Sequence, residues 1–318
     1  MQKIYAIGES LVDIIFDKGE VKAARPGGSM LNSSVSLGRA GKEVYFLSEL
    51  GNDQIGDLVV GFLETNQVNT RYVHRYTQGK TALALAFLNE KGDAAYDFYK
   101  SYPPTRMQLE IPPFSSDDIF LFGSFFGIDP AIRPTMVSIA NAAKLAGALL
   151  VYDPNFRKPH AHQLEKLRPF ILENMQLAHI IRASHEDMEI IFGETSAKKL
   201  SQMPQLKGKV LILTQNSAGV YLQSDFHTAC FRAPKIEVVS TIGAGDNFNA
   251  GLIFGLVQQN ISTKHLPTIT HGQWESIIGY AIGFASEVCR SYDNYISEKF
   301  AVNLPGNKNN TTPFSQNP

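Results

Sequence analysis

Short apolar runs alternate with longer amphipathic stretches along most of the chain. Seven runs rich in aliphatic and aromatic residues predict strands at 3–8, 43–50, 118–123, 148–153, 178–183, 209–214 and 219–223. Several are apolar at successive positions, as expected for parallel strands that helices cover on both faces. Stretches of helical length and spacing lie at 54–66, 130–147, 162–175 and 270–290. The alternation predicts an α/β fold with an open, doubly wound, mostly parallel sheet that binds ligands at the carboxyl ends of its strands.

Two segments depart from this alternation. Residues 11–25 and 81–100 have the pattern of β-hairpins that turn at 17–19 and 90–93. Neither segment contains a crossover helix, so neither can be an ordinary βα unit. We expect the two hairpins to form a small antiparallel sheet that projects from the main body. Such a sheet can cover a cleft or form a dimer interface.

Composition narrows the class of protein. The 318 residues carry a formal net charge of -1 and contain no basic run, so neither nucleic acid nor an acidic membrane surface is an expected partner. Cys230 and Cys289 lie far apart and outside any CxxC pattern, which favours a reduced, cytoplasmic location. We expect one domain over 1–304 and a disordered, Asn-rich tail over 305–318.

A glycine-containing loop at 243–246 carries the first candidate chemistry. Gly243, Ala244 and Gly245 come before an apolar helical pattern, so their backbone N–H groups and the positive end of the helix can hold an anion. Asp246, in the first turn, can act as the general base when a hydroxyl accepts a phosphoryl group. An ordinary glycine-rich turn followed by a helix-initiating aspartate explains the same spacing equally well. The loop is not a GxxxxGK[ST] motif, and the first strand is not followed by GxGxxG.

A second glycine segment lies at 26–41, with the sequence PGGSMLNSSVSLGRAG. Gly27 and Gly28 would let the main chain approach a polyol closely, and Asn32 offers both a donor and an acceptor. A tight turn followed by a small-residue helix packed on the sheet is the alternative reading.

Together these segments resemble the ribokinase-like (PfkB) carbohydrate kinase family, and its fructokinase branch in particular, over residues 3–300. The resemblance rests on four motifs: GESLVDI with Asp13, PGGSMLNSSVSLGRAG, DPNFRKPH with Asn155 and Arg157, and TIGAGDNF with Asp246. The resemblance implies a three-layer α/β/α sandwich with a small antiparallel β-lid, which accounts for the two hairpins.

The resemblance also implies an activity: transfer of the γ-phosphate of ATP to a primary hydroxyl of a sugar, most readily fructose. Asp246 would be the general base, residues 243–245 would hold the transferred group, and Mg²⁺ would arrive with ATP. The substrate-binding residues implied are Asp13, Gly27, Gly28, Asn32, Tyr99, Asn155 and Arg157. The nucleotide-binding residues implied are Ser184, Asp187, Thr214, Asn216 and Gly219. The lid would suit a homodimer.

Several positions depart from the family pattern. Ser240 replaces the aspartate associated with a monovalent cation, which leaves activation by K⁺ open, and Asp187 stands in for a glutamate. Asn216 replaces a glycine and is the residue best suited to adopt a positive φ there. Lys100, beside Tyr99, replaces an arginine and lacks its planar fork, which favours a neutral sugar over a sugar acid.

The alternatives are other enzymes or a non-enzyme. A ketodeoxygluconate or nucleoside kinase would use the same scaffold, and a sugar- or nucleotide-binding regulator with weakened catalysis would share the same motifs. A dinucleotide-dependent oxidoreductase is disfavoured by the missing glycine fingerprint.

Overall fold

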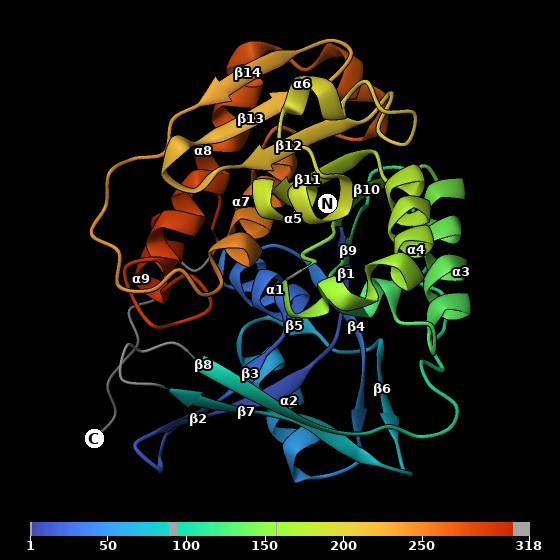
Figure 1. Cartoon of the computed structure of the whole chain (residues 1–318), viewed down its shortest axis with the longest axis vertical. Helices are drawn as coiled ribbons and strands as arrows, with labels where there is room; N and C mark the ends of the chain where they lie inside the picture. The colour runs from blue at the N-terminus through green and yellow to red at the C-terminus, as the bar shows by residue number, and fades with distance from the viewer. Residues whose placement is uncertain (1, 89–93, 157, 308–318) are drawn as a thin grey trace.

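A computed structural model describes residues 2–88, 94–156 and 158–307. Its main sheet has the strand order β14-β13-β12-β11-β10-β9-β1-β4-β5, and β6 pairs with β4 (Figure 1). All neighbouring strands are parallel except at the β12–β13 and β13–β14 pairs. The strands are β1 Ile4–Ile7, β4 Val44–Gly51, β5 Val68–Asn69, β6 Val73–Tyr76, β9 Ile119–Gly123, β10 Leu149–Asp153, β11 Ile180–Ser184, β12 Val210–Thr214, β13 Val220–Gln223 and β14 Thr228–Phe231.

Helices cover both faces of this sheet, so its central strands are buried throughout. In β1 the side chains alternate: Ile4 and Ala6 belong to one core cluster, and Tyr5 and Ile7 belong to the other. The first face is covered by α1 Ser29–Arg39, α2 Gln54–Thr65, α7 Ala244–Gln258, α8 His271–Val288 and α9 Glu298–Val302. The second is covered by α3 Arg133–Leu145, α4 Leu164–Leu177, α5 His185–Phe192 and α6 Ala197–Leu200. Short 3-10 turns lie at η1 Phe125–Ile128, η2 Lys158–Gln163, η3 Asn216–Ala218 and η4 Thr263–Thr268.

A separate four-stranded sheet, called the lid below, lies beyond one edge of the main body (Figure 1). Its strands are β2 Leu11–Asp17, β3 Glu20–Gly27, β7 Lys80–Leu88 and β8 Ala94–Ser101, in the order β3-β2-β7-β8. Both hairpins are antiparallel as predicted, but the central β2–β7 pair is parallel because both strands start at the main body and run outwards.

The first hairpin turn shows why the sequence makes a hairpin here. Lys18 and Gly19 have φ values of 52° and 85°, so a two-residue turn with both residues in the left-handed region joins β2 to β3. The turn expected at 90–93 lies outside the residues that the structure describes.

The lid is fixed to the main body at the start of β7. Asp53, the N-cap of α2, accepts hydrogen bonds from the backbone N–H of Gly56 at 2.8 Å and of Thr81 at 2.9 Å. The Thr81 hydroxyl donates to the same carboxylate at 2.8 Å. One aspartate therefore both begins a helix and holds the base of a lid strand.

Most predicted elements are confirmed, with each of the seven strands ending within two residues of its expected bounds. The two-residue β5 and the four-residue strands β6 and β14 were not predicted. The described residues continue past 304 to Asn307, which is buried and whose Nδ2 donates to the carbonyl oxygens of Arg39 and Ala301. Residues 308–318 lie outside the described part of the chain. None of the described helices is long and apolar enough to cross a membrane.

Candidate active site

The candidate residues gather at the carboxyl edge of the main sheet, as the fold class predicts. Asp153 ends β10, Ser184 ends β11 and Thr214 ends β12. Helices α1 and α7 begin at this edge, and the lid lies beside it (Figure 1).

Asp246 is held between the first turns of two helices. It is the third residue of α7, after the N-cap Gly243, which has a φ of 76°. The hydroxyl of Ser29 donates to its Oδ1 at 2.6 Å, and Nδ2 of Asn32 donates to its Oδ2 at 2.9 Å. The residue is 5% exposed. Both carboxylate oxygens are therefore oriented, at the positive end of a helix, by the glycine segment that starts α1.

Close contacts require the two glycines of the segment at 26–41, where sugar-binding residues were expected and which is called the sugar segment below. A Cβ on Gly27 would lie 2.2 Å from Oδ2 of Asp13, and a Cβ on Gly28 would lie 2.2 Å from the carbonyl oxygen of Glu9. Gly28 also has a φ of 137°, which side chains rarely allow. Within the described residues, Oδ1 of Asn32 is buried without a hydrogen-bond partner, so it can accept one from a ligand hydroxyl.

Tyr99 is not brought together with these residues. In the lid register Asp13 pairs with Ala84 and Ala84 with Phe98, so Asp13 shares a face with Phe98 and Lys100. Tyr99 points to the opposite face of β8 and is 59% exposed. The sequence motif could not show this, because neighbouring residues of a strand alternate between faces.

Lys100 has a partner that the sequence did not suggest. Its ammonium group forms an ion pair with Glu9, whose Oε1 also accepts a hydrogen bond from the Tyr102 hydroxyl at 2.5 Å. The Arg106 guanidinium lies 3.6 Å from the centroid of the Tyr102 ring. The positive charge of Lys100 is thus matched by a carboxylate within the protein.

The expected nucleotide residues lie side by side on β11 and β12. Ser184 pairs with Thr214 in the parallel ladder and is the N-cap of α5 in a capping box with Asp187. Oδ1 of Asp187 accepts from the backbone N–H of Phe156 at 2.8 Å, so this carboxylate also orders the segment after β10.

Two residues of the turn at 214–219, where nucleotide-binding residues were expected and which is called the nucleotide segment below, have positive φ values. Asn216 has a φ of 47°, which confirms the prediction made for it, and Gly219 has a φ of 108°. A Cβ on Gly219 would lie 2.2 Å from the carbonyl oxygen of Phe231, so a glycine is needed where the turn meets β14.

A buried network that the sequence did not predict joins the expected nucleotide residues to the loop at 243–245, called the anion loop below. Nη1 of Arg182 donates to Oδ2 of Asp153 at 2.8 Å, and Nη2 donates to Oγ1 of Thr214 at 3.0 Å. A Cβ on Gly245 would lie 3.0 Å from Nη1, so the guanidinium packs directly against this glycine. The sequence does contain one indication of this network: Arg182 stands in an otherwise apolar strand, and a buried charged side chain needs a partner.

Asp153 is the counter-ion in that network. Its Oδ2 also accepts from Nδ2 of Asn249 at 2.6 Å, and its Oδ1 accepts from the backbone N–H of Asn155 at 3.0 Å. Burial raises the pKa of the Asp153 carboxyl, and the adjacent Arg182 acts in the opposite direction. The structure places Asn155 beside this network. Arg157 lies outside the described residues.

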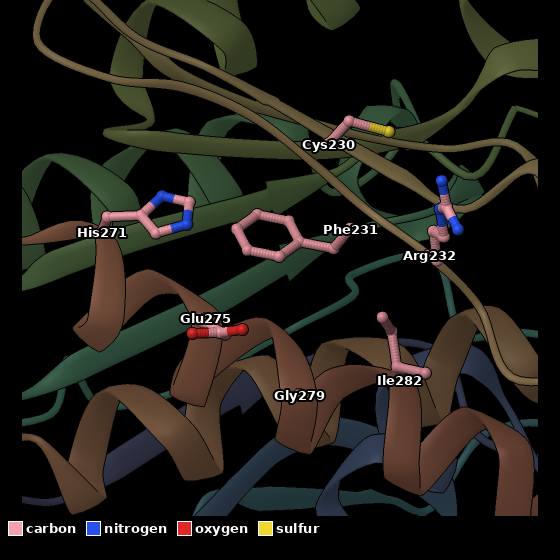
Figure 2. A pocket seen from close by; sticks show the side chains of 7 residues that line it. All are labelled: Cys230, Phe231, Arg232, His271, Glu275, Gly279 and Ile282. Atoms are coloured by element: carbon pink, nitrogen blue, oxygen red, sulfur yellow. The ribbon is translucent and has the colours of Figure 1, made fainter.

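A cavity of about 290 Å³ lies beyond the nucleotide segment, between β14 and α8. Figure 2 shows the Phe231 ring between His271 and Arg232 above the helix. Val220, directly after the 214–219 turn, pairs with Phe231, so the cavity adjoins that turn. Its lining residues are Cys230, Phe231, Arg232, His271, Glu275, Gly279 and Ile282.

These features are those of a phosphotransferase of ribokinase-like fold: a glycine-started helix whose first N–H groups can hold an anion, a carboxylate in its first turn and a small sheet beside the same edge. Residues 1–299 match the model of the pfkB family carbohydrate kinases, so the chain belongs to that family. It is an ATP-dependent carbohydrate kinase, as the resemblance implied.

Curated relatives include fructokinases of plants. The probable fructokinase-2 of Arabidopsis thaliana is 29% identical over 271 residues, which cover 80% of this chain and 81% of the relative. Fructokinase-2 of Solanum lycopersicum is 29% identical over 270 residues, covering 80% of this chain and 81% of that protein.

Solved structures share the fold. Aminoimidazole riboside kinase from Salmonella enterica, complexed with aminoimidazole riboside and an ATP analog, aligns with a TM-score of 0.79 at 22% identity, covering 94% of this chain and 100% of that chain. Fructokinase from Vibrio cholerae O395, bound to fructose, ADP and calcium, aligns with a TM-score of 0.80 at 19% identity, covering 94% and 96%. The expected ribokinase-like sandwich with a lid is confirmed.

Proposed function

We propose that this kinase phosphorylates a primary hydroxyl of a neutral hexose, most readily fructose, with Asp246 as the general base. The orientation of Asp246 supports this proposal most strongly. Its carboxylate lies in the first turn of α7, and donors from the sugar segment hold both of its oxygens. The plant fructokinases among the relatives point to the same substrate class.

On the sugar side, Asp13 would accept hydrogen bonds from sugar hydroxyls, and the unpartnered Oδ1 of Asn32 would accept another. Gly27 and Gly28 would let the main chain approach the ring. Lys100 is already paired with Glu9, so its ammonium group is less available to bind a carboxylate of a substrate. A neutral sugar therefore fits better than a sugar acid.

On the nucleotide side, the residues at the ends of β11 and β12 would contact ATP. Its base would lie towards the cavity beside Phe231, and its phosphates would extend past Thr214 to the loop at 243–245. Arg182, packed against Gly245, would add positive charge behind that loop. Mg²⁺ would arrive bound to the ATP phosphates, largely coordinated by water.

Ser240 stands where the family pattern has an aspartate associated with a monovalent cation, so this position offers a hydroxyl in place of a carboxylate. The hydroxyl of Ser240 accepts a hydrogen bond from the backbone N–H of Ile242 at 3.2 Å, within its own loop. The proposed reaction therefore includes no step that depends on K⁺.

In the proposed reaction the sugar hydroxyl loses its proton to Asp246 as its oxygen forms a bond to the γ-phosphorus. The bond between that phosphorus and the β-phosphate oxygen breaks, and ADP leaves with the electron pair. The N–H groups at 243–245 would stabilise the charge on the transferred group. Closure of the lid would exclude water and so limit hydrolysis of ATP.

A substrate panel tests the proposal. ADP formation from ATP and Mg²⁺ would be measured with fructose, ribose, adenosine and ketodeoxygluconate, each with and without K⁺. We expect fructose to have the highest kcat/KM, with no requirement for K⁺. A preference for ketodeoxygluconate or adenosine would assign a different kinase on this scaffold, and no sugar-dependent ADP formation would favour a binding regulator.

We further propose that two copies associate through the lid in the cytoplasm. The lid exposes large aromatic side chains, with Tyr96 at 43% and Phe98 at 54%, on its edge strand β8. Unpaired edge strands of this kind readily pair with another chain. Light scattering coupled to gel filtration would show the mass of a dimer, and Phe98→Glu would shift it towards the monomer.

A further inference from the structure

The residue after Asp246 is an asparagine that joins three segments of the chain. Asn247 is fully buried. Its Nδ2 donates to the carbonyl oxygen of Gly243 at 2.8 Å and to that of Asn294 at 2.8 Å. Its Oδ1 accepts from the hydroxyl of Ser36 in α1 at 2.5 Å. Every hydrogen-bonding group of this side chain is thus used to connect the anion loop to its surroundings.

Residues 292–294, called the bridge below, follow the end of α8 and contact this loop. A Cβ on Gly243 would lie 3.1 Å from the carbonyl oxygen of Asn294, so the two backbones touch. The chain is anchored just beyond the bridge, where the backbone N–H of Ile296 donates to the hydroxyl of Ser36 at 3.1 Å.

The other contact of the bridge is with the lid. Nη1 of Arg25, on β3, donates to Oδ1 of Asp293 at 2.7 Å and to the carbonyl oxygen of Tyr292 at 3.2 Å. Arg25 is directly opposite Asp13 in the hairpin register. A movement of the lid strand that carries Asp13 therefore acts on the bridge, and through it on Gly243.

We propose that Asn247 is a positioning residue for the anion loop and that the bridge transmits the position of the lid to it. The inference rests on the proposed function, in which the sugar contacts the lid at Asp13 and the phosphates contact residues 243–245. A lid held over the sugar keeps Arg25 on Asp293. The carbonyl oxygen of Asn294 then holds Asn247, which orients Gly243. Sugar binding and nucleotide binding are thereby coupled.

We call this chain of contacts from Arg25 through the bridge to Asn247 the relay. The contacts at its two ends differ in strength. The side chains of Arg25 and Asp293 are 36% and 51% exposed, so their pair is weak and Arg25 can be replaced without unfolding the protein. Loss of this pair is expected to reduce the coupling about two- to five-fold. Asn247 is buried with all its hydrogen bonds made, so its replacement should abolish the coupling and weaken nucleotide binding even without sugar.

Hydrogen exchange of the unliganded protein tests the relay without any substrate. The variant is Arg25→Gln, and the matched control is Lys22→Gln, which removes the Lys22–Asp17 pair within the same hairpin but leaves the bridge untouched. We expect Arg25→Gln to accelerate exchange several-fold in 292–295 and also in 243–247, and Lys22→Gln to change neither. Faster exchange confined to 292–295 would overturn the inference.

Calorimetric binding of ADP with Mg²⁺, with and without saturating fructose, tests the coupling itself. The wild type and Lys22→Gln should bind ADP more tightly with fructose than without it. In Arg25→Gln the ratio of the two affinities should be about two- to five-fold smaller. In Asn247→Ser fructose should no longer change the affinity for ADP. An unchanged gain in both variants would overturn the inference while the proposed function stands. If fructose neither changes ADP binding nor is phosphorylated, the result would count against the proposed function. The hydrogen-exchange data alone would then show whether the lid and the anion loop are linked.

Discussion

Nδ2 of Asn32 lies 2.9 Å from Oδ2 of Asp246, so the first turn of α1 orients a carboxylate in the first turn of α7. The two residues are 214 positions apart in the sequence. Each carboxylate oxygen has further lone pairs, so Asp246 can still accept a hydrogen bond from a ligand hydroxyl.

Asp246→Asn should abolish most turnover without unfolding the protein. An amide cannot take the proton of the sugar hydroxyl, and loss of a general base typically costs ~10²–10⁴ in rate. Steady-state kinetics would give the rate, with circular dichroism and ADP calorimetry as checks on fold and binding. Asn32→Ala is the control, because it removes an orienting donor but keeps the base, and it should retain more activity. Turnover of Asp246→Asn close to that of the wild type would refute the assigned role.

Gly243→Ala and Gly245→Ala should weaken ADP binding by different routes. Gly243 has a φ of 76°, where a side chain costs about 1–2 kcal/mol, whereas a Cβ on Gly245 would press on Arg182 at 3.0 Å. Gly61→Ala in α2 is the matched control, since a Cβ there meets nothing within 4 Å. Urea unfolding should show Gly61→Ala stabilised by about 0.5–1 kcal/mol. Equal ADP affinity in all three variants would contradict this account.

Arg182→Met should destabilise the protein by about 3–5 kcal/mol, because it leaves the buried Asp153 carboxylate without its counter-ion. Adding Asp153→Asn to that variant removes the unpaired charge and should recover part of the loss. The measurement is a double-mutant cycle of unfolding free energies in urea. Additive single losses would show that the two side chains do not act as a pair.

Acid should destabilise the protein through His179. Its Nδ1 accepts from the backbone N–H of Leu150 at 3.0 Å, and burial, followed by Lys209 and Lys144, lowers the pKa of this imidazole from 6.5 to about 4. The folded protein holds the ring neutral while the unfolded chain protonates it, so its contribution is complete above pH 6.5 and falls as the pH approaches 4. His179→Asn keeps an acceptor but cannot titrate. Its unfolding midpoint should therefore vary less over this range than that of the wild type, and parallel pH profiles would argue against His179.

Glu9→Gln should broaden the substrate range towards sugar acids. The substitution leaves Lys100 without its carboxylate partner, so a cation becomes available beside the sugar residues of the lid. We expect kcat/KM for ketodeoxygluconate relative to fructose to rise about five-fold, the scale of a partly exposed ion pair. Asp17→Asn, which breaks the exposed Lys22 pair at the far end of the same hairpin, should leave the ratio unchanged. An unchanged ratio in Glu9→Gln would show that Lys100 does not face the substrate.

Local sequence determined much of this molecule. Strands apolar at successive positions must be covered on both faces, so the seven apolar runs, alternating with helical stretches, predicted a main sheet between two helical layers. Lys18–Gly19 was sufficient to specify a hairpin turn, because few residue pairs adopt two successive positive φ values. The glycines at 27, 28, 243 and 245 marked both helix starts of the site, because each stands just before or at the start of a helical pattern in the sequence.

Tertiary structure decided which of these residues act together. The pairing of Asn32 with Asp246, the position of Arg182 against Gly245 and the lid face occupied by Tyr99 depend on contacts between distant segments. No local pattern encodes such contacts, since hydrogen-bond partners and strand register are set by how the layers pack. The sequence thus predicted the loop at 243–245 and its aspartate, and the fold decided which side chains orient that aspartate.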